Sequence, residues 1–300
     1  MDIISVAVTD VGRTRQNNED NFYLCGEYRR DVDLPNMTVT FSDKRDTYLF
    51  GVCDGMGGEA YGELASLIAV RRMDDYALDF DVKINEYVEK ANAEICEEII
   101  SHDGKRIGTT LAALSISGNI ARAYNVGDSR IYHVRDGIIK QVSEDHTQIQ
   151  MLINQGFVSE NDAKKHPARH ILTQHLGIFP DEMIIEPFCA EPIAVQDGDI
   201  FLICSDGLTD TLADSDLLEI LISDENLEQK ANKLIESALN TGSRDNITVV
   251  MVEISEKSAP PETAKKHIDY EAAEALLNKH YSPGRAKLIS EIMKMIRECE

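Results

Sequence analysis

The stretch Tyr48-Leu49-Phe50-Gly51-Val52-Cys53-Asp54-Gly55-Met56-Gly57-Gly58 is an apolar run that ends in a carboxylate and then breaks into glycines. A short run of β-favouring apolar residues predicts a buried strand. Asp54 then lies where the strand ends, and the glycines after it let another group approach the main chain closely. Because a buried carboxylate is costly unless a cation neutralises it, this stretch predicts a cation site at the end of a sheet.

The pattern of an apolar strand followed by Asp-Gly recurs at Asp206 and Gly207. Three more aspartates stand where strands are predicted to begin or end, at Asp20, Asp128 and Asp245. A single aspartate at such a place usually caps a turn or a helix, but five together indicate converging oxygen ligands. Such ligands suit Mg²⁺ or Mn²⁺. Two of these ions, about 3.5–4 Å apart, can ionise a shared water for attack on a phosphate.

A phosphate substrate also needs a positively charged side chain in the site. Arg15 precedes Glu19 by four residues, and its planar guanidinium matches phosphate oxygens in a way that lysine does not. An exposed surface arginine is the alternative interpretation. His146, His166 and His170 lack zinc-type spacing, and we expect surface or packing roles for them rather than proton transfer.

The order of elements predicts short antiparallel strands joined by tight turns, with helices before and after them. Strands are expected at 3–10, 21–24, 48–54, 109–116, 120–126, 130–134, 138–142, 199–204 and 246–254. Helices are expected at 62–77, 83–102, 147–156, 160–166, 207–222 and 226–240. The segment 29–46 is charged and irregular, which indicates a surface excursion.

The C-terminal part of the chain differs from the rest in composition. Residues 1–255 are expected to form the catalytic domain, 256–267 a linker rich in Pro and Ser, and 268–300 a helical extension. The apolar stripe of the last helix, which includes Leu288 and Ile292, either packs on its own domain or contacts a partner.

Charge and composition restrict the partners. The chain has 300 residues, with 53 acidic and 30 basic side chains and a formal net charge of −23. Such a surface repels nucleic acid and anionic membranes, so we expect neither as a partner. Scattered cysteines without a CxxC pair, no long apolar run and no signal-like N-terminus predict a soluble, cytoplasmic protein.

The chain resembles the metal-dependent PPM family, the type 2C protein serine/threonine phosphatases, and is most similar to its compact bacterial members. The resemblance covers about residues 5–254, and the matching motifs follow the family order. They are Arg15-Gln16-Asn17-Asn18-Glu19-Asp20, Val52-Cys53-Asp54-Gly55-Met56-Gly57-Gly58, Gly108-Thr109-Thr110, Asn125-Val126-Gly127-Asp128-Ser129-Arg130, Glu144-Asp145-His146-Thr147, His166-Pro167-Ala168-Arg169, Leu172-Thr173-Gln174-His175-Leu176-Gly177, Cys204-Ser205-Asp206-Gly207-Leu208 and Arg244-Asp245-Asn246-Ile247-Thr248-Val249.

The resemblance implies an α+β fold, a four-layer α-β-β-α sandwich of two antiparallel sheets flanked by helix pairs. It implies hydrolysis of phosphoserine and phosphothreonine in proteins by water activated by two Mn²⁺ or Mg²⁺ ions, without a phosphoenzyme. The expected partners are phosphorylated proteins and a cognate serine/threonine kinase, whose action the enzyme would reverse. Residues 145–178 match the mobile flap beside the active site.

The resemblance also assigns roles to the acidic residues. Asp54 would bridge the two ions, and Gly55 would bind one through its carbonyl. Asp206 and Asp245 would bind the second ion, and Glu19 and Asp20 would act through metal-bound waters. Asp128 would hold a third, weaker ion, and Arg15 would hold the substrate phosphate.

One position departs from the animal members of the family. They carry a histidine, proposed as general acid, where this chain has Met56, so a metal-bound water would have to protonate the leaving group. Two alternatives remain open: a catalytically silent scaffold with the phosphatase fold, and a phosphatase dedicated to an anti-sigma-type regulatory switch. The scaffold predicts loss of a metal carboxylate, and none is lost.

Overall fold

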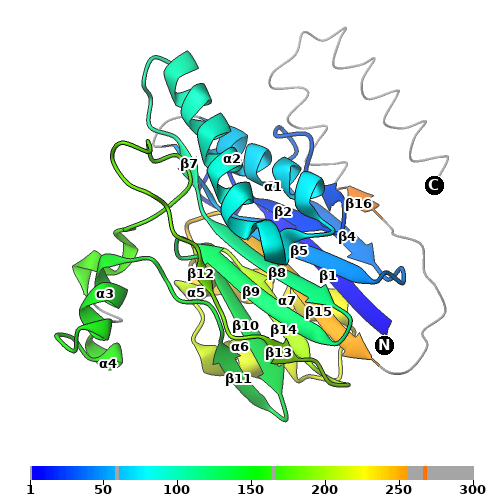
Figure 1. Cartoon of the computed structure of the whole chain (residues 1–300). Helices are drawn as coiled ribbons and strands as arrows, with labels where there is room; N and C mark the ends of the chain where they lie inside the picture. The colour runs from blue at the N-terminus through cyan, green and yellow to red at the C-terminus, as the bar shows by residue number, and fades with distance from the viewer. Residues whose placement is uncertain (1, 58–60, 164–165, 256–265, 269–300) are drawn as a thin grey trace, which may run out of the picture.

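Two antiparallel β-sheets form the body of the protein (Figure 1). The computed structural model describes residues 2–57, 61–163, 166–255 and 266–268. The first sheet has the order β11-β10-β14-β15-β1-β4-β16. Its strands are β1 (Asp2–Asp10), β4 (Met37–Phe41), β10 (Arg130–Arg135), β11 (Ile138–Gln141), β14 (Ile200–Cys204), β15 (Ile247–Ser255) and β16 (Lys266–Ile268).

The second sheet has the order β12-β9-β8-β5-β2-β3, and β13 also pairs with β9. Its strands are β2 (Asn21–Leu24), β3 (Glu27–Tyr28), β5 (Thr47–Cys53), β8 (Leu111–Ser117), β9 (Ile120–Val126), β12 (Phe188–Cys189) and β13 (Ile193–Ala194). A short pair, β6 (Gly55–Met56) and β7 (Gly108–Thr109), continues from the end of β5.

Helices cover the outer face of each sheet. α1 (Gly62–Tyr76) and α2 (Phe80–Ser101) pack on the second sheet, where their side chains share a buried cluster with β5 and β8. α5 (Asp206–Thr209), α6 (Asp214–Leu221) and α7 (Leu227–Thr241) pack on the first sheet. A third cluster fills the space between the sheets. The predicted α+β class and the two antiparallel sheets are therefore confirmed.

Strand β5 explains why its sequence is continuously apolar. Tyr48, Phe50 and Val52 point into the space between the sheets, whereas Leu49 and Cys53 point toward the helices. Because successive side chains alternate between faces, both faces of this strand are buried. Its end is thereby held rigidly in the middle of the second sheet, and Asp54 follows directly.

The structure corrects two local predictions. The segment 29–46 is not a surface excursion, because it contains β4, which pairs with β1 and buries Met37, Val39 and Phe41. Charged residues on both sides concealed this short alternating strand. The single helix expected at 207–222 is divided into α5 and α6, since the chain turns between them.

The C-terminal predictions fall mostly outside the described residues. Within the expected linker and helical extension, only Lys266–Ile268 is described, and it forms β16 rather than a linker or a helix. β16 pairs antiparallel with β4 and covers the edge of the first sheet. The sequence pattern did not predict this strand.

Residues 145–178 stand apart from the sandwich. They include α3 (Gln148–Asn154), α4 (Glu160–Ala163) and the 3₁₀ helix Pro167–His170, and α3 and α4 lie beside the sandwich in Figure 1. Both ends of the segment are tied to the body. The His146 N–H donates to the Gly127 carbonyl at 2.8 Å, and Leu176 pairs with Thr109. In the described part of the chain, no helix has the length and apolar character needed to cross a membrane.

Candidate metal centre

The five predicted aspartates approach one another from separate strand ends. Asp54 follows β5, and the carboxylates that act on it electrostatically are those of Asp20, Asp206, Asp245 and Asp128. The pKa of Asp54 is raised well above its ordinary value. Burial is the larger cause, and repulsion from these neighbouring carboxylates adds to it. The convergence expected from the sequence is therefore present.

The neighbouring acidic residues also have raised pKa values. Burial raises the pKa of Asp20 to about 6, although hydrogen bonds from Ser205 and Thr248 oppose the shift. Burial and the nearby Glu63 carboxylate raise the pKa of Glu19 to about 7. Burial and repulsion also raise the pKa values of Asp206 and Asp128, the latter to about 7.

This donor set fits hard divalent cations. The converging atoms are carboxylate oxygens, the ligands that Mg²⁺ and Mn²⁺ prefer. Several carboxylates held this close repel one another unless cations neutralise them. Asp54, Asp206 and Asp245 are each only partly covered by protein, so a solvent-borne ion and a substrate can reach them.

Arg15 lies at the rim of the cluster. Its side chain is 47% exposed, and its guanidinium contacts one oxygen of the Asp245 carboxylate at 2.6 Å. The other oxygen accepts the main-chain N–H of Asn246 at 2.8 Å. The sequence predicted Arg15 and Asp245 in separate roles, and the structure places them in direct contact.

In each Asp-Gly pair, the glycine leaves room for another loop of the metal centre. A Cβ added to Gly55 would lie 2.4 Å from the carbonyl oxygen of Glu19, and one added to Gly207 would lie 1.9 Å from that of Asn246. Both contacts are far inside van der Waals distance. The recurring Asp-Gly therefore joins each ligand to a second loop that carries further ligands.

Hydroxyl and amide side chains fix the ligands from behind. The Thr110 hydroxyl accepts the Asp54 N–H at 2.9 Å, and the Ser205 hydroxyl donates to Asp20 at 2.7 Å. The Asn246 side chain accepts the Glu19 N–H at 2.8 Å and donates to the carbonyl of Asn17. These residues lie in the quoted motifs, but sequence reasoning gave them no role.

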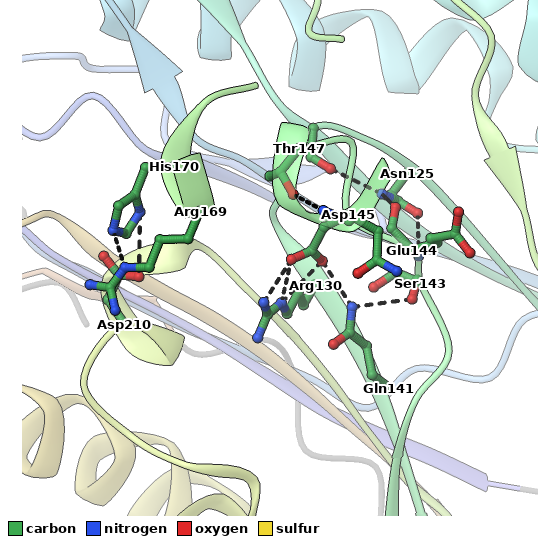
Figure 2. Close-up of polar contacts among 12 residues, drawn as sticks. Asn125, Arg130, Gln141, Ser143, Glu144, Asp145, Thr147, Arg169, His170 and Asp210 are labelled. Carbon is green, nitrogen blue, oxygen red and sulfur yellow. Dashed lines mark hydrogen bonds and ion pairs between the residues drawn. The ribbon is translucent and has the colours of Figure 1, made fainter. Parts of the chain in front are cut away.

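His170 and Asp210 lie next to Asp206, an arrangement that was not predicted; Figure 2 shows the contact between His170 and Asp210. One ligand atom each from His170, Asp206 and Asp210 lies within 4.8 Å of the others, an arrangement that could hold a metal ion. The His170 ring nitrogen Nδ1 is 3.7 Å from Asp210. Asp210 is four residues after Asp206, so helical spacing could have indicated it. His170 is exposed, as expected, and its ring lies next to Asp210.

The N-terminal root of residues 145–178 is fixed beside Asp128. Arg130 contacts the buried Asp145 carboxylate through Nε at 3.0 Å and through a terminal nitrogen at 2.6 Å, and Gln141 donates to the same carboxylate (Figure 2). The Asn125 side chain donates to the Glu144 carbonyl at 2.7 Å. These contacts join the segment to β9 and β10.

Comparisons with known proteins agree with this geometry. Residues 25–241 match the family described as protein phosphatase 2C. The chain is 34% identical over 255 residues to the serine/threonine phosphatase stp of Listeria monocytogenes, which covers 82% of this chain and 93% of that protein. The structure of the S. agalactiae serine/threonine phosphatase has a TM-score of 0.72 at 30% identity, covering 84% of this chain and 100% of that one.

A further similar structure contains metal. The catalytic domain of the serine/threonine protein phosphatase PstP, in complex with two manganese ions, has a TM-score of 0.68 at 29% identity and covers 85% of this chain and 100% of that one. Two antiparallel sheets with a carboxylate centre at their strand ends define a metal-dependent phosphatase. The chain belongs to the protein phosphatase 2C family. The relatives described above, stp and PstP, are serine/threonine phosphatases. The resemblance found in the sequence is confirmed.

Proposed function

We propose that this protein hydrolyses phosphoserine and phosphothreonine in proteins at a centre built from Asp54, Asp206 and Asp245, with Glu19 and Asp20 beside them. The observation that carries this proposal is the convergence of acidic side chains on Asp54 and Asp206, whose pKa values are raised by burial and by repulsion from the neighbouring aspartates. Two Mn²⁺ or Mg²⁺ ions held there would activate water for in-line attack on the phosphorus. In this assignment Asp54 would hold both ions, and the Gly55 carbonyl would supply a further oxygen ligand.

The chain's own residues then bind and orient the substrate. Arg15 holds the phosphate, and its present contact with Asp245 supports this role because the arginine already lies next to the ligands. An ion on Asp245 would compete for the same carboxylate and release the guanidinium toward the phosphate. A planar guanidinium can contact two phosphate oxygens at once.

Asp128 holds a third, weaker ion in this proposal. Its proximity to Asp206 and Asp210 supports the assignment, and His170 supplies a nitrogen on the same side. Since Met56 cannot donate a proton, protonation of the leaving alkoxide falls to this side of the centre. Unchanged turnover of a phosphothreonine peptide by Asp128→Ala, across pH and Mn²⁺ concentration, would exclude that role.

Residues 145–178 act as a flap that contributes to substrate choice, and residues 1–255 form the catalytic domain. The attachment of both flap ends to the body, at Gly127 and Thr109, supports this division. We infer phosphoproteins and a cognate serine/threonine kinase as functional partners. The free thiols of the described cysteines agree with a reducing, cytoplasmic setting.

Manganese-dependent hydrolysis of p-nitrophenyl phosphate tests the proposed centre. Asp206→Asn should abolish it, because the amide keeps the size of the side chain but loses the charge that binds the ion. Asp43→Asn, at an exposed site, is the matched control and should retain activity. A wild-type protein that is inactive with every divalent ion would instead favour a silent scaffold.

A further inference from the structure

Arg29 is a buried arginine that the proposed reaction does not use. It follows β3, its side chain has no exposed surface, and it is among the largest fully buried side chains of the described residues. Its main chain is fixed by Asn21, whose side chain accepts the Arg29 N–H at 3.0 Å and donates to the Arg29 carbonyl at 2.9 Å. The main chain of Arg29 is therefore fixed against β2.

The guanidinium joins two loops through their carbonyl oxygens. One terminal nitrogen donates to Asn18 at 2.6 Å and to Asp20 at 2.7 Å, on the loop that carries Glu19. The other donates to Val32 at 2.8 Å and to Leu34 at 3.1 Å, on the loop that leads to β4. The planar fork thus ties the main chain of the acidic loop to that of a neighbouring loop.

Other side chains also restrain the main chain of this acidic loop: the Ser66 hydroxyl donates to the Glu19 carbonyl at 2.6 Å, and the Asn246 side chain accepts the Glu19 N–H at 2.8 Å. The Asn18 side chain accepts the Asp20 N–H at 3.1 Å and donates to the Pro35 carbonyl at 2.8 Å, which again joins the two loops. The Asp20 carboxylate is held separately, by Ser205 on the opposite side. Arg29 therefore holds the Asp20 carbonyl, and Ser205 helps to orient the Asp20 carboxylate.

Stability alone does not account for this arginine. Burial lowers its pKa to about 10, so it stays charged at neutral pH. A buried charge is costly, and an apolar side chain of similar volume often gives equal or greater stability. Its Nε has no hydrogen-bond partner among the described residues. What an apolar side chain cannot supply is four directed donors and a fixed positive charge behind an acidic cluster.

We propose that Arg29 is a positioning residue that sets the Glu19–Asp20 loop for divalent-cation binding. This inference rests on the proposed assignment of Glu19 and Asp20 to the metal centre. Because supporting residues behind metal ligands commonly contribute about 10–100-fold in metal affinity, the effect should appear in Mn²⁺ binding before it appears in turnover.

The experiment is calorimetric titration of the metal-free, full-length protein with Mn²⁺, together with kcat at saturating Mn²⁺. Arg29→Lys keeps the charge but loses the fork, and we expect a roughly tenfold weaker Mn²⁺ affinity with kcat largely retained. Arg29→Met should weaken binding further. Asn21→Ala, which loosens the Arg29 main chain without removing a charge, should change affinity in the same direction and covers the case in which an Arg29 variant does not fold.

Arg135→Lys is the matched control. Arg135 also makes a forked contact, to Asp199 through Nε at 2.7 Å and a terminal nitrogen at 2.6 Å, but it lies at the end of β10 away from Asp128. It should lower the melting temperature without changing Mn²⁺ affinity. Unchanged Mn²⁺ affinity in folded Arg29→Lys and Asn21→Ala would overturn the inference.

Asp20→Asn separates this inference from the proposed function. If Asp20→Asn weakens Mn²⁺ binding and the Arg29 and Asn21 variants do not, the metal centre stands and the positioning role is wrong. If Asp20→Asn also leaves binding unchanged, the assignment of this loop to the metal centre fails, and the role of Arg29 fails with it.

Discussion

At the scale of single residues, the Asp-Gly pairs use glycine for space. Neither Gly55 nor Gly207 adopts the left-handed conformation that favours glycine. Each instead lies against a main-chain carbonyl of another loop of the centre. Because glycine has no Cβ, two ligand loops can come into direct contact at each position. Even the small side chain of alanine should therefore disturb them.

Gly207→Ala should destabilise the protein and disable the centre. The new Cβ would meet the Asn246 carbonyl at 1.9 Å, so the loops must separate, at a cost of about 3 kcal/mol. Displaced ligands should reduce Mn²⁺-dependent hydrolysis by about 100-fold. Gly137→Ala is the control: it has a positive φ but no neighbour within 4 Å, so it should cost about 1 kcal/mol and retain activity.

The metal-free protein should lose stability as pH rises. The pKa values of Glu19 and Asp128 are about 7 and that of Asp20 is about 6, against about 4 in the unfolded chain. The folded state therefore holds protons that the unfolded state has released. By linkage, its stability is greatest below pH about 4 with respect to these groups and declines through pH 6–7.

Urea denaturation in EDTA at pH 5 and pH 8 measures this effect. We expect the free energy of unfolding to be lower at pH 8 than at pH 5 by at least about 2 kcal/mol, and saturating Mn²⁺ should remove most of this difference. Asp20→Asn should flatten the pH dependence of the metal-free protein. Greater stability at pH 8 than at pH 5 without metal would contradict the assignment.

At the scale of elements, ligands and flap share the same strand ends. β9 and β10 enclose Asp128, and the same turn holds the root of residues 145–178 through Asn125 and Arg130. A change at the flap root can therefore reach both substrate contacts and the proposed third-ion ligand. At the far end of β10, Arg135 instead contacts Asp199.

Arg130→Met should loosen the flap root. It leaves the buried Asp145 carboxylate with Gln141 as its remaining side-chain donor, which should lower the unfolding free energy by about 2 kcal/mol. The KM for a phosphopeptide should rise more than that for p-nitrophenyl phosphate, because only the peptide extends to the flap. The control is Arg122→Met, at the more exposed pair with Asp81. It should cost about 0.5 kcal/mol of stability and leave both KM values unchanged. If Arg130→Met changed both KM values equally, this would argue against the flap role.

Removal of residues 256–300 should uncover the edge of β4, which β16 now covers. An unpaired strand edge is a template for association with another chain. We expect concentration-dependent self-association in light scattering, while hydrolysis of p-nitrophenyl phosphate continues because every proposed ligand precedes residue 256. A monomeric, fully stable truncated protein would show that β16 does not protect this edge.

At the scale of the whole molecule, the sequence predicted the elements with strong periodicity. The strand before Asp54, the helices near 62–77 and 83–102 and the turns around Gly118 and Gly137 follow from local patterns, and the structure has them. β4 was not predicted because its alternation of apolar and polar residues covers only five residues between charged segments. β16 was not predicted because its formation depends on pairing with β4, which is distant in the sequence, rather than on its own composition.

The site was predicted to a similar extent. Asp54 and Asp206 carry a local Asp-Gly signal, so their proximity could be expected. Arg29 and Asn246 act on main-chain atoms of other loops, and no spacing in the sequence reveals such a contact. The place of His170 beside Asp206 and Asp210 depends on how residues 145–178 fold back onto the body.

The pairing of β1 with β15 has a consequence for the synthesis of the protein. Asp2 lies opposite Ser255 and Asp10 opposite Ile247, so β1 can pair with β15 only after the rest of the sandwich between them has been synthesised. Asp245, immediately before β15, arrives at the same late moment. A nascent chain is therefore inactive as a phosphatase until nearly all of the domain has been translated and the first sheet has closed.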